Sequence, residues 1–301
     1  MLTLFASPKP FADPHVALIQ RNAILSWAHL APRPEIFLVG DAAGVADLAT
    51  ELRVPHIRDV PVNESGTPLL DGVFAAVEKR SRADHFCYMN ADIILMDDFP
   101  RAVDQVLSWN AQAVLVGDRI ELDVRRPLDF ERDEWQVEIR DDVKRRGERL
   151  GAGPDFVVYA RGALTPMPPF AIGRTTFDNW FMWRAVHDGR PVVNVGKAAT
   201  IIHQVHSGAA EWAAMRGSVE ARANRALASE WACSYTLEDC THELVGEAVV
   251  SRRSAMRRHR AAAALAIGRN RGRAGARALL NSPPVRATPL PRLLRGRPSR
   301  D

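Results

Sequence analysis

The chain has 301 residues, of which 47% are hydrophobic, and this is enough for one large domain with a buried core. Such a composition excludes a chain that is disordered throughout. The formal net charge of +4 hides an uneven distribution, because residues 251–301 hold 14 arginines and a single acid, Asp301. That segment therefore carries +13 and residues 1–250 carry −9, so any attraction to a polyanionic surface belongs to the C-terminal segment.

The cysteines Cys87, Cys233 and Cys240 are odd in number and lack a CxxC spacing. This pattern argues against a disulfide framework and a cysteine zinc site, and it fits a reducing compartment. No stretch reaches the roughly 18 apolar residues of a membrane span, and the apolar run at 2–6 is too short for a signal peptide. We therefore expect a cytoplasmic protein. Its basic segment can hold it at the inner face of a membrane, and no specific nucleic-acid partner is expected.

Short apolar runs alternate with helical patterns through the first half of the chain. They predict strands at 2–6, 35–40, 85–89 and 113–117. Asp13 followed by Pro14 is typical of a helix start, and Thr67 followed by Pro68 repeats this signal before the third strand. The alternation predicts an α/β fold whose sheet is largely parallel and flanked by helices.

The second half is less regular. Residues 119–149 are dense in charge and poor in periodicity, which predicts an exposed insertion or flexible loop. Further strands are expected at 155–159 and at 192–195, the latter running on towards 200–203. A helix is expected around 178–187 and a helical cap over 211–250. After Arg252 the chain becomes rich in Arg, Ala and Pro, which predicts a partly disordered basic tail. The expected organisation is one domain over 1–250 and a tail over 251–301.

Asn90 and Asp92 follow the third expected strand in the string MNAD. A carboxylate just beyond the C-terminal end of a central strand lies where open α/β sheets bind ligands. Such a carboxylate can hold Mg²⁺ or Mn²⁺, which acts as a Lewis acid on a leaving diphosphate. An isolated pair of this kind more often only ends a strand and stabilises a turn, so its context decides between the two interpretations.

Five strings together resemble a family of bacterial glycosyltransferase-like proteins of the GT-A class: GTPLLDGVF at 66–74, MNADIIL at 89–95, GPDFVVYARG at 153–162, PPFAIGRTTFDNWFMWRA at 168–185 and TIIHQVH at 200–206. The resemblance covers about residues 1–210. It implies a GT-A fold, in which a Rossmann-like sheet binds a nucleotide sugar, together with a DxD-type metal motif. Asn90 departs from that motif, so the resemblance implies that Asp92 contacts the metal while Asn90 contacts the ribose or a metal-bound water.

The resemblance also implies a metal ligand from the pair His203 and His206. His203 is preferred because it directly follows a strand, and imidazole suits Mn²⁺ better than Mg²⁺. Asp178 matches the acid that would act as general base on the acceptor, although its place near a helix start also fits a helix cap. Trp180 and Trp183 would either flank a sugar or pack in the core.

The expected contacts with the nucleotide sugar lie at other strand ends. Pro8 and Lys9 follow the first strand and Asp41 follows the second. Asp155 follows a glycine-containing turn that permits close backbone approach, and Asn90 completes the set. For Asp155, a role in stabilising the turn is an equal alternative.

The sequence thus predicts a metal-assisted glycosyltransferase that moves a sugar from a nucleotide diphosphate to a hydroxyl of a glycan or lipid-linked acceptor. Two alternatives stay open. A nucleotidyltransferase would need a glycine-rich basic loop after the first strand, which is not found there. A non-catalytic nucleotide-sugar-binding protein is favoured by Asn90. Hydrolase, zinc-protease and dehydrogenase functions are weakened because no GxSxG, HExxH or GxGxxG follows an expected strand.

Overall fold

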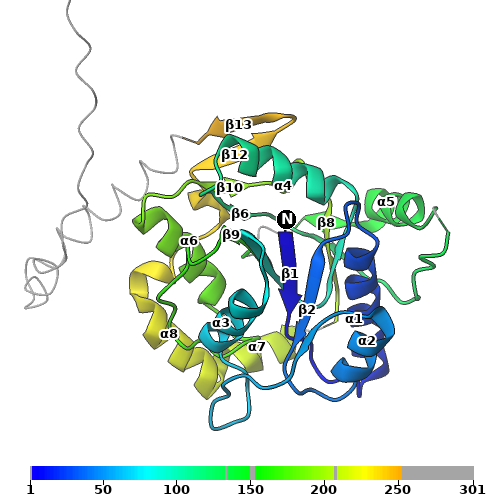
Figure 1. Cartoon of the computed structure of the whole chain (residues 1–301), viewed down its shortest axis with the longest axis horizontal. Helices are drawn as coiled ribbons and strands as arrows, with labels where there is room; N and C mark the ends of the chain where they lie inside the picture. Colours follow the sequence, from blue (N-terminus) through cyan, green and yellow to red (C-terminus); the bar gives the residue numbers. More distant parts are fainter. Residues whose placement is uncertain (1, 133, 150–152, 207–208, 253–301) are drawn as a thin grey trace, which may run out of the picture. The chain divides into compact units, whose positions relative to one another are not determined.

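The computed structural model describes residues 2–132, 134–149, 153–206 and 209–252. Within them, the main sheet has the strand order β13-β12-β10-β6-β9-β4-β1-β2-β3 (Figure 1). Its strands are β1 (Leu2–Ala6), β2 (Glu35–Val39), β3 (His56–Ile57), β4 (His85–Met89), β6 (Val114–Val116), β9 (Phe156–Ala160), β10 (Val192–Asn194), β12 (His242–Val245) and β13 (Ala248–Ser251). Neighbours pair in parallel, except that β9 is antiparallel to β4 and β6, and β13 is antiparallel to β12.

A second, smaller sheet has the order β5-β11-β7-β8. Its strands are β5 (Ile93–Leu95), β7 (Ile120–Leu122), β8 (Glu148–Arg149) and β11 (Ile201–Gln204). β11 pairs antiparallel with β5 and parallel with β7. Because β5 follows β4 after three residues, the chain passes from one sheet to the other at 90–92.

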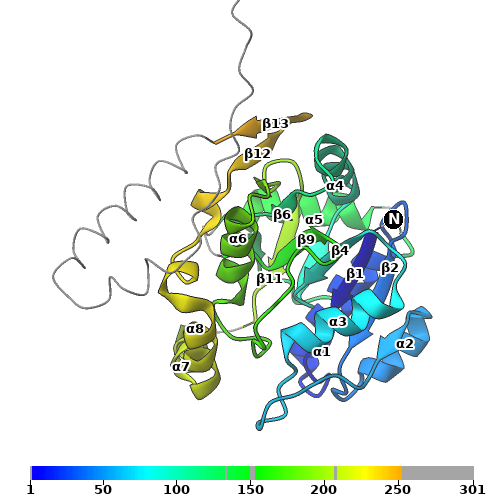
Figure 2. The same cartoon turned by 60° about the vertical axis from the view of Figure 1, so that its left-hand side comes forward.

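Helices cover both faces of the main sheet (Figures 1 and 2). Alternating side chains of its strands pack against these two helical layers. Leu4 and Ala6 face the layer formed by α1 (Pro14–Ala28), α2 (Val45–Leu52) and α4 (Asp98–Trp109). Phe5 faces the layer formed by α3 (Leu70–Arg80), α6 (Phe177–His187) and α8 (Val219–Ala232), next to α7 (Ala209–Gly217). The expected α/β fold with a mostly parallel, helix-flanked sheet is confirmed.

Helix starts were predicted with mixed success. Asp13 caps α1, since its carboxylate accepts hydrogen bonds from the backbone N–H groups of His15 and Val16. The signal at Thr67 is wrong, because α3 begins at Leu70. The Thr67 N–H instead donates to the side-chain oxygen of Asn63 in a turn. Ser, Thr, Asn and Pro are frequent in turns as well as at helix starts, so this signal does not distinguish the two.

Residues 119–149 are not an unstructured insertion, which corrects the sequence-based expectation. They contain β7, β8 and α5 (Trp135–Arg146), and Trp135 and Ile139 are buried against the smaller sheet. The dense charge is accommodated by ion pairing. Asp142, for example, pairs with Arg126 and Arg146. Charge density therefore reflects a salt-bridged helix and not a loop.

The expected helical cap over 211–250 is correct only in its first half, where α7 and α8 lie. Residues 242–251 form the β12–β13 hairpin, which extends the main sheet through the pairing of β12 with β10. Leu244 is buried in the core and anchors this hairpin. The expected domain boundary at residue 250 falls inside β13, and residues 253–301, with the membrane contact expected of them, lie outside the described residues. Of the helices in the described part, none is long and apolar enough to span a membrane.

Hydrogen bonds from α1 hold the first strand of the smaller sheet in place. The indole Nε1 of fully buried Trp27 donates to the Ile93 carbonyl at 2.7 Å. The Ser26 hydroxyl accepts from the Leu95 N–H at 3.0 Å. α1 thus positions β5, the strand that begins directly after Asp92.

We expect Trp27→Phe to lower the free energy of unfolding by about 1–3 kcal/mol, because it leaves the buried Ile93 carbonyl without its donor. Trp109→Phe is the matched control, since Trp109 is 45% exposed and surface changes stay within about 0.5 kcal/mol. Urea unfolding at constant m-value measures both. Equal losses in the two variants would show that the Trp27 hydrogen bond contributes nothing.

Candidate functional site

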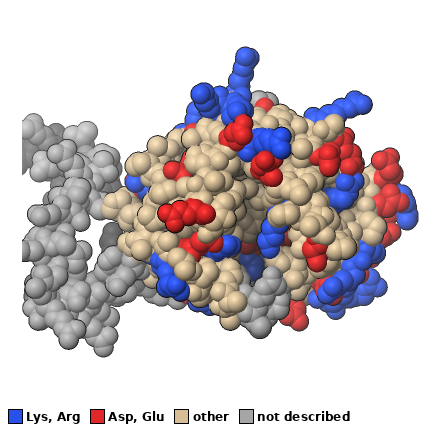
Figure 3. Space-filling model, turned by 90° about the horizontal axis from the view of Figure 1, so that it is seen from below, with Lys and Arg blue, Asp and Glu red and all other residues tan. Residues whose placement is uncertain are grey.

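The C-terminal ends of β1, β2 and β4 lie at one edge of the main sheet because these strands are parallel neighbours. Pro8 and Lys9 follow β1, Asp41 follows β2, and Asn90 follows β4, so the fold brings these expected residues to the same edge. Figure 3 views the face toward which these strand ends point. A hollow near the centre of this face has both basic and acidic side chains on its walls.

Asp92 lies beside two histidines where the two sheets meet. Its backbone carbonyl accepts from the Gln204 backbone N–H at 3.2 Å, and His203 pairs in register with Ile93. The Asp92 Oδ2 atom lies 3.0 Å from His206 Nε2 and 3.7 Å from His203 Nε2. One ligand atom from each of these side chains lies within 4.8 Å of the others, and we call the three residues the Asp92 cluster.

The Asp92 cluster fits a divalent cation. The Oδ1 atom of Asp92 is buried and has no hydrogen-bond partner. A buried carboxylate oxygen of this kind carries an uncompensated desolvation cost of about 1–3 kcal/mol, which a bound cation would remove. One carboxylate and two imidazoles suit Mn²⁺ and similar transition metals better than Mg²⁺ or Ca²⁺.

The charges of the cluster are mutually stabilising. Burial acts to raise the pKa of Asp92, but hydrogen bonds from His203 and His206 outweigh it and hold that pKa well below its usual range. Burial acts to lower the pKa of His203, but Asp92 and Glu121 outweigh burial and raise that pKa to about 10. Without metal, His203 is therefore a cation between two carboxylates, and a metal ion would replace its proton.

Asn90 and Asp155 form a second group next to the cluster. The antiparallel direction of β9 brings Asp155 to the end of β4, where Asn90 Nδ2 donates to Asp155 Oδ1 at 2.8 Å. The guanidinium of Arg119 donates to Asp155 Oδ2. Burial raises the pKa of Asp155, and Arg119 opposes this effect. An aspartate at position 90 would repel Asp155, which is a physical reason for the amide in place of the first acid of a DxD motif.

Asp178 lies in the first turn of α6 against Gly153. A side chain at Gly153 would place its Cβ 2.3 Å from Asp178 Oδ2, so only glycine allows this approach. Thr176 is the N-cap residue of α6 and Asp178 lies in the first turn, where backbone hydrogen bonds at the helix start act to lower its pKa, so the alternative role of Asp178 in stabilising the helix start stays open. Asp178 Oδ1 is buried without a hydrogen-bond partner. Burial, with a contribution from Asp155, raises the pKa of Asp178 to about 6.

Tyr88 is influenced by all three acids, Asp92, Asp155 and Asp178. Its ring is buried, and its pKa is raised first by burial and then by the carboxylates of Asp92, Asp155 and Asp178. The phenol therefore stays protonated. Phe177, directly before Asp178, packs edge-on against this ring with centroids 6.1 Å apart.

Several expected residues lie at the edge of this arrangement. Lys9 is exposed, and its backbone N–H and carbonyl are bound by the Gln20 side chain. Asp41 is exposed and pairs with Arg58. Trp180 is buried in the core against Phe170 and Phe181, and Trp183 stacks on His187 of the same helix with centroids 5.1 Å apart. The packing interpretation is confirmed for Trp180, whereas Trp183 is only partly buried against the core.

Sequence reasoning missed Glu121 and Arg119. Glu121 Oε2 lies 2.6 Å from His203 Nδ1, and Glu121 Oε1 accepts from Arg119 Nε at 2.6 Å. The available signal was the alternation of apolar Ile120 and Leu122 around Glu121, which indicates a short strand with one polar face.

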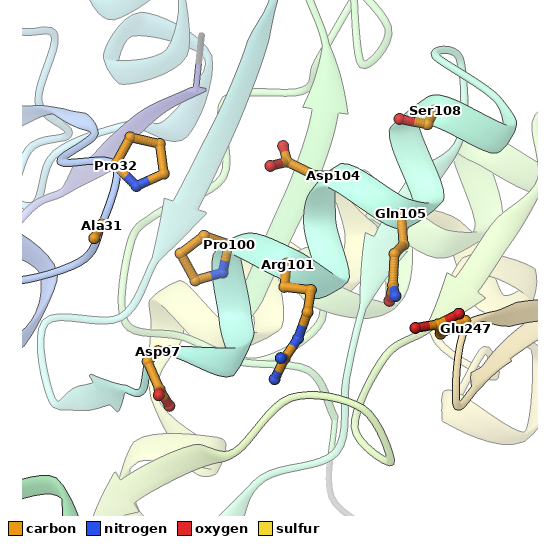
Figure 4. Close-up of a pocket in the computed structure, with 9 residues that line it drawn as sticks. All are labelled: Ala31, Pro32, Asp97, Pro100, Arg101, Asp104, Gln105, Ser108 and Glu247. Atoms are coloured by element: carbon orange, nitrogen blue, oxygen red, sulfur yellow. The ribbon is translucent and has the colours of Figure 1, made fainter.

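A separate surface hollow of about 640 Å³ lies along α4 (Figure 4). Pro100, Arg101 and Asp104 line it together with Pro32 and Glu247. Among the described residues that line it there is no member of the Asp92 cluster, so this hollow is distinct from the candidate site.

Comparison with known proteins finds similar solved structures. No protein-family model matches the chain, and a search of curated proteins finds no match. Among solved structures, the chain is similar to glucosyl-3-phosphoglycerate synthase from Mycobacterium tuberculosis, in complex with Mn²⁺, UDP and phosphoglyceric acid. That match has 12% identity and a TM-score of 0.47, and it covers 78% of this chain and 79% of the other.

Two other similar structures are S. aureus TarS with UDP-GlcNAc and a Pyrobaculum calidifontis mannosyltransferase with GDP-Man and Mn²⁺. TarS has 12% identity and a TM-score of 0.46. The mannosyltransferase has 12% identity and a TM-score of 0.41. Each match covers 69% of this chain, which spans only 60% of the TarS chain and 58% of the mannosyltransferase chain. What this chain does is therefore inferred from its own residues.

We expect Asp92→Asn to weaken Mn²⁺ binding by more than about 100-fold, because loss of an outer partner of a metal ligand alone costs about 10–100-fold. Asp104→Asn, an exposed acid, is the control. Calorimetry gives both dissociation constants. In the unmutated protein the Mn²⁺ affinity should rise with pH, because the proton on His203 competes with the metal. Mn²⁺ binding by Asp92→Asn at unmutated affinity would place the metal elsewhere.

Proposed function

We propose that this chain is a glycosyltransferase that moves a sugar from a nucleotide diphosphate to a hydroxyl acceptor with the help of a divalent cation. One observation supports the proposal. A cluster of possible metal ligands and a carboxyl group of raised pKa lie together at the C-terminal edge of one sheet. This edge is where open α/β sheets bind ligands. The five sequence strings that resemble GT-A enzymes supply the reaction class.

The two acids would divide the chemistry. Asp92, with His203 and His206, would hold a cation that neutralises the charge developing on the leaving diphosphate. Asp178 is ionised above pH 6, so it can take the proton of an attacking hydroxyl at neutral pH. A general base is most efficient when its pKa lies near the pH at which the enzyme works, and the raised pKa of Asp178 suits work near neutral pH.

The neighbouring residues would bind and orient the donor. Asp155 is held by Asn90 and Arg119, one at each carboxylate oxygen, so its orientation beside Asn90 is restrained. We propose that Asp155 and Asn90 contact the hydroxyls of the donor. Pro8, Lys9 and Asp41, at the ends of β1 and β2, would contact its nucleotide part.

A nucleotide-release assay over a panel of UDP- and GDP-sugars, with Mn²⁺ or with EDTA, tests the proposal. Water replaces the acceptor slowly, so one class of donor should release its nucleotide in the presence of Mn²⁺ and not in EDTA. Asp92→Asn protein serves as the blank. If folded, Mn²⁺-loaded protein hydrolyses no donor and transfers to no sugar or lipid-linked acceptor, the proposed function is wrong.

We expect Asp178→Asn to reduce the kcat of transfer by about 10²–10⁴-fold while the Kd of the donor stays within about twofold, because a general base acts only on the acceptor. In the unmutated protein, kcat/KM should fall about tenfold per unit as the pH drops below 6, since protonation removes the base.

The control for this variant is Asp188→Asn, an acid at the other end of α6 that pairs with Arg184. It should transfer normally. Equal losses of donor affinity and turnover in Asp178→Asn, or a pH profile that the substitution leaves unchanged, would exclude Asp178 as the base.

A further inference from the structure

Glu121 connects the Asp92 cluster to the donor-side group. It lies on β7, directly opposite His203 in the parallel pairing with β11. Its Oε2 atom lies 2.6 Å from His203 Nδ1, and its Oε1 atom accepts from Arg119 Nε at 2.6 Å. Arg119 in turn donates to Asp155. The four side chains are largely buried, with exposed fractions between 11% and 18%.

We propose that Glu121 is a positioning residue that fixes which nitrogen of His203 faces the metal. An imidazole offers its lone pair from one nitrogen only, and the hydrogen bond of the other nitrogen decides which one. The Glu121 carboxylate can only accept, so Nδ1 is the donor, and Nε2 is the nitrogen that a metal would take once its own proton leaves; Nε2 is also the one directed at Asp92, 3.7 Å from Oδ2. This inference rests on the metal role in the proposed function.

The geometry separates this role from direct ligation. Both carboxylate oxygens of Glu121 are already engaged, one by His203 and one by Arg119. Glu121 is also not a member of the ligand cluster formed by Asp92, His203 and His206. Its distance to His203 is that of a strong charge-assisted hydrogen bond, which restrains the rotation of the ring.

Arg119 completes the positioning. It is the shared donor of Glu121 and Asp155, so it holds one carboxylate on the metal side and one on the donor side. The planar guanidinium fixes the angle between these two hydrogen bonds. Arg119 thus restrains the position of Glu121 independently of His203.

Two substitutions of similar size test the role of Glu121. Glu121→Met removes the acceptor, whereas Glu121→Gln keeps an oxygen that can accept from Nδ1. The control is Glu148→Met. Glu148 lies on β8, directly opposite Glu121 of β7 in the sheet, but it is exposed. The Mn²⁺ dissociation constant is measured by calorimetry, and the visible absorption of bound Co²⁺ reports the histidine ligands.

We expect Glu121→Met to weaken Mn²⁺ binding by about 10–100-fold and to alter the Co²⁺ spectrum. Glu121→Gln should restore most of the affinity, and Glu148→Met should bind Mn²⁺ as the unmutated chain does. Mn²⁺ affinity within about twofold of the unmutated value in Glu121→Met, or the same loss in Glu121→Gln and Glu121→Met, overturns the proposal.

If Glu121→Met fails to fold, nitrogen NMR of the unmutated, Zn²⁺-loaded protein decides. A proton on His203 Nδ1 supports the proposal, and a proton on Nε2 overturns it. These measurements do not depend on sugar transfer. A chain in which Glu121 behaves as expected toward Mn²⁺ but which turns over no nucleotide sugar would overturn the proposed function alone, whereas a chain that binds no metal would overturn both.

Discussion

The pairing of β11 with β5 is the constraint on which the candidate site depends. The chain leaves the main sheet after β4, passes through Asn90 and Asp92, and enters the smaller sheet as β5. β11 then returns antiparallel to β5, so His203 comes to lie beside the residue that follows Asp92. Buried hydrogen bonds between α1 and the backbone of Ile93 and Leu95 hold the strand that follows this crossing point. The ligand geometry is therefore set by backbone pairing, and side-chain packing supports it.

The same edge keeps its carboxylates in different states. Asp92 lies against two imidazoles and stays ionised, whereas Asp178 lies against the bare backbone of Gly153 and titrates near pH 6. Pairs of acids whose surroundings push their pKa values apart are typical of sites where one group stabilises charge and another transfers a proton. Asp155 is intermediate between these two acids, because burial raises its pKa and the neighbouring Arg119 opposes part of that rise.

The sequence was informative wherever local pattern decides structure. The apolar run of β4 followed by polar residues correctly located Asn90 and Asp92 after a strand, whereas His203, expected directly after a strand, lies inside β11. Contacts between residues far apart in the chain could not be predicted from the sequence. Glu121 lies on a three-residue strand inside a charged stretch, and its partner His203 is 82 positions away. The direction of β9, which brings Asp155 to Asn90, is likewise a property of the whole sheet.

The separation of the ligands along the chain has a consequence for how the protein is made. Asp92 and His206 lie 114 positions apart. At a synthesis rate of about 5–20 residues per second, Asp92 leaves the ribosome roughly 6–23 s before the second imidazole does. During that interval β1, β2 and β4 can already pair while their acidic edge has no metal-binding histidine. On a growing chain, a cation held by all three side chains could therefore bind only after most of the domain has been made, so it would join the fold late, unlike the metal on which a zinc finger depends to fold.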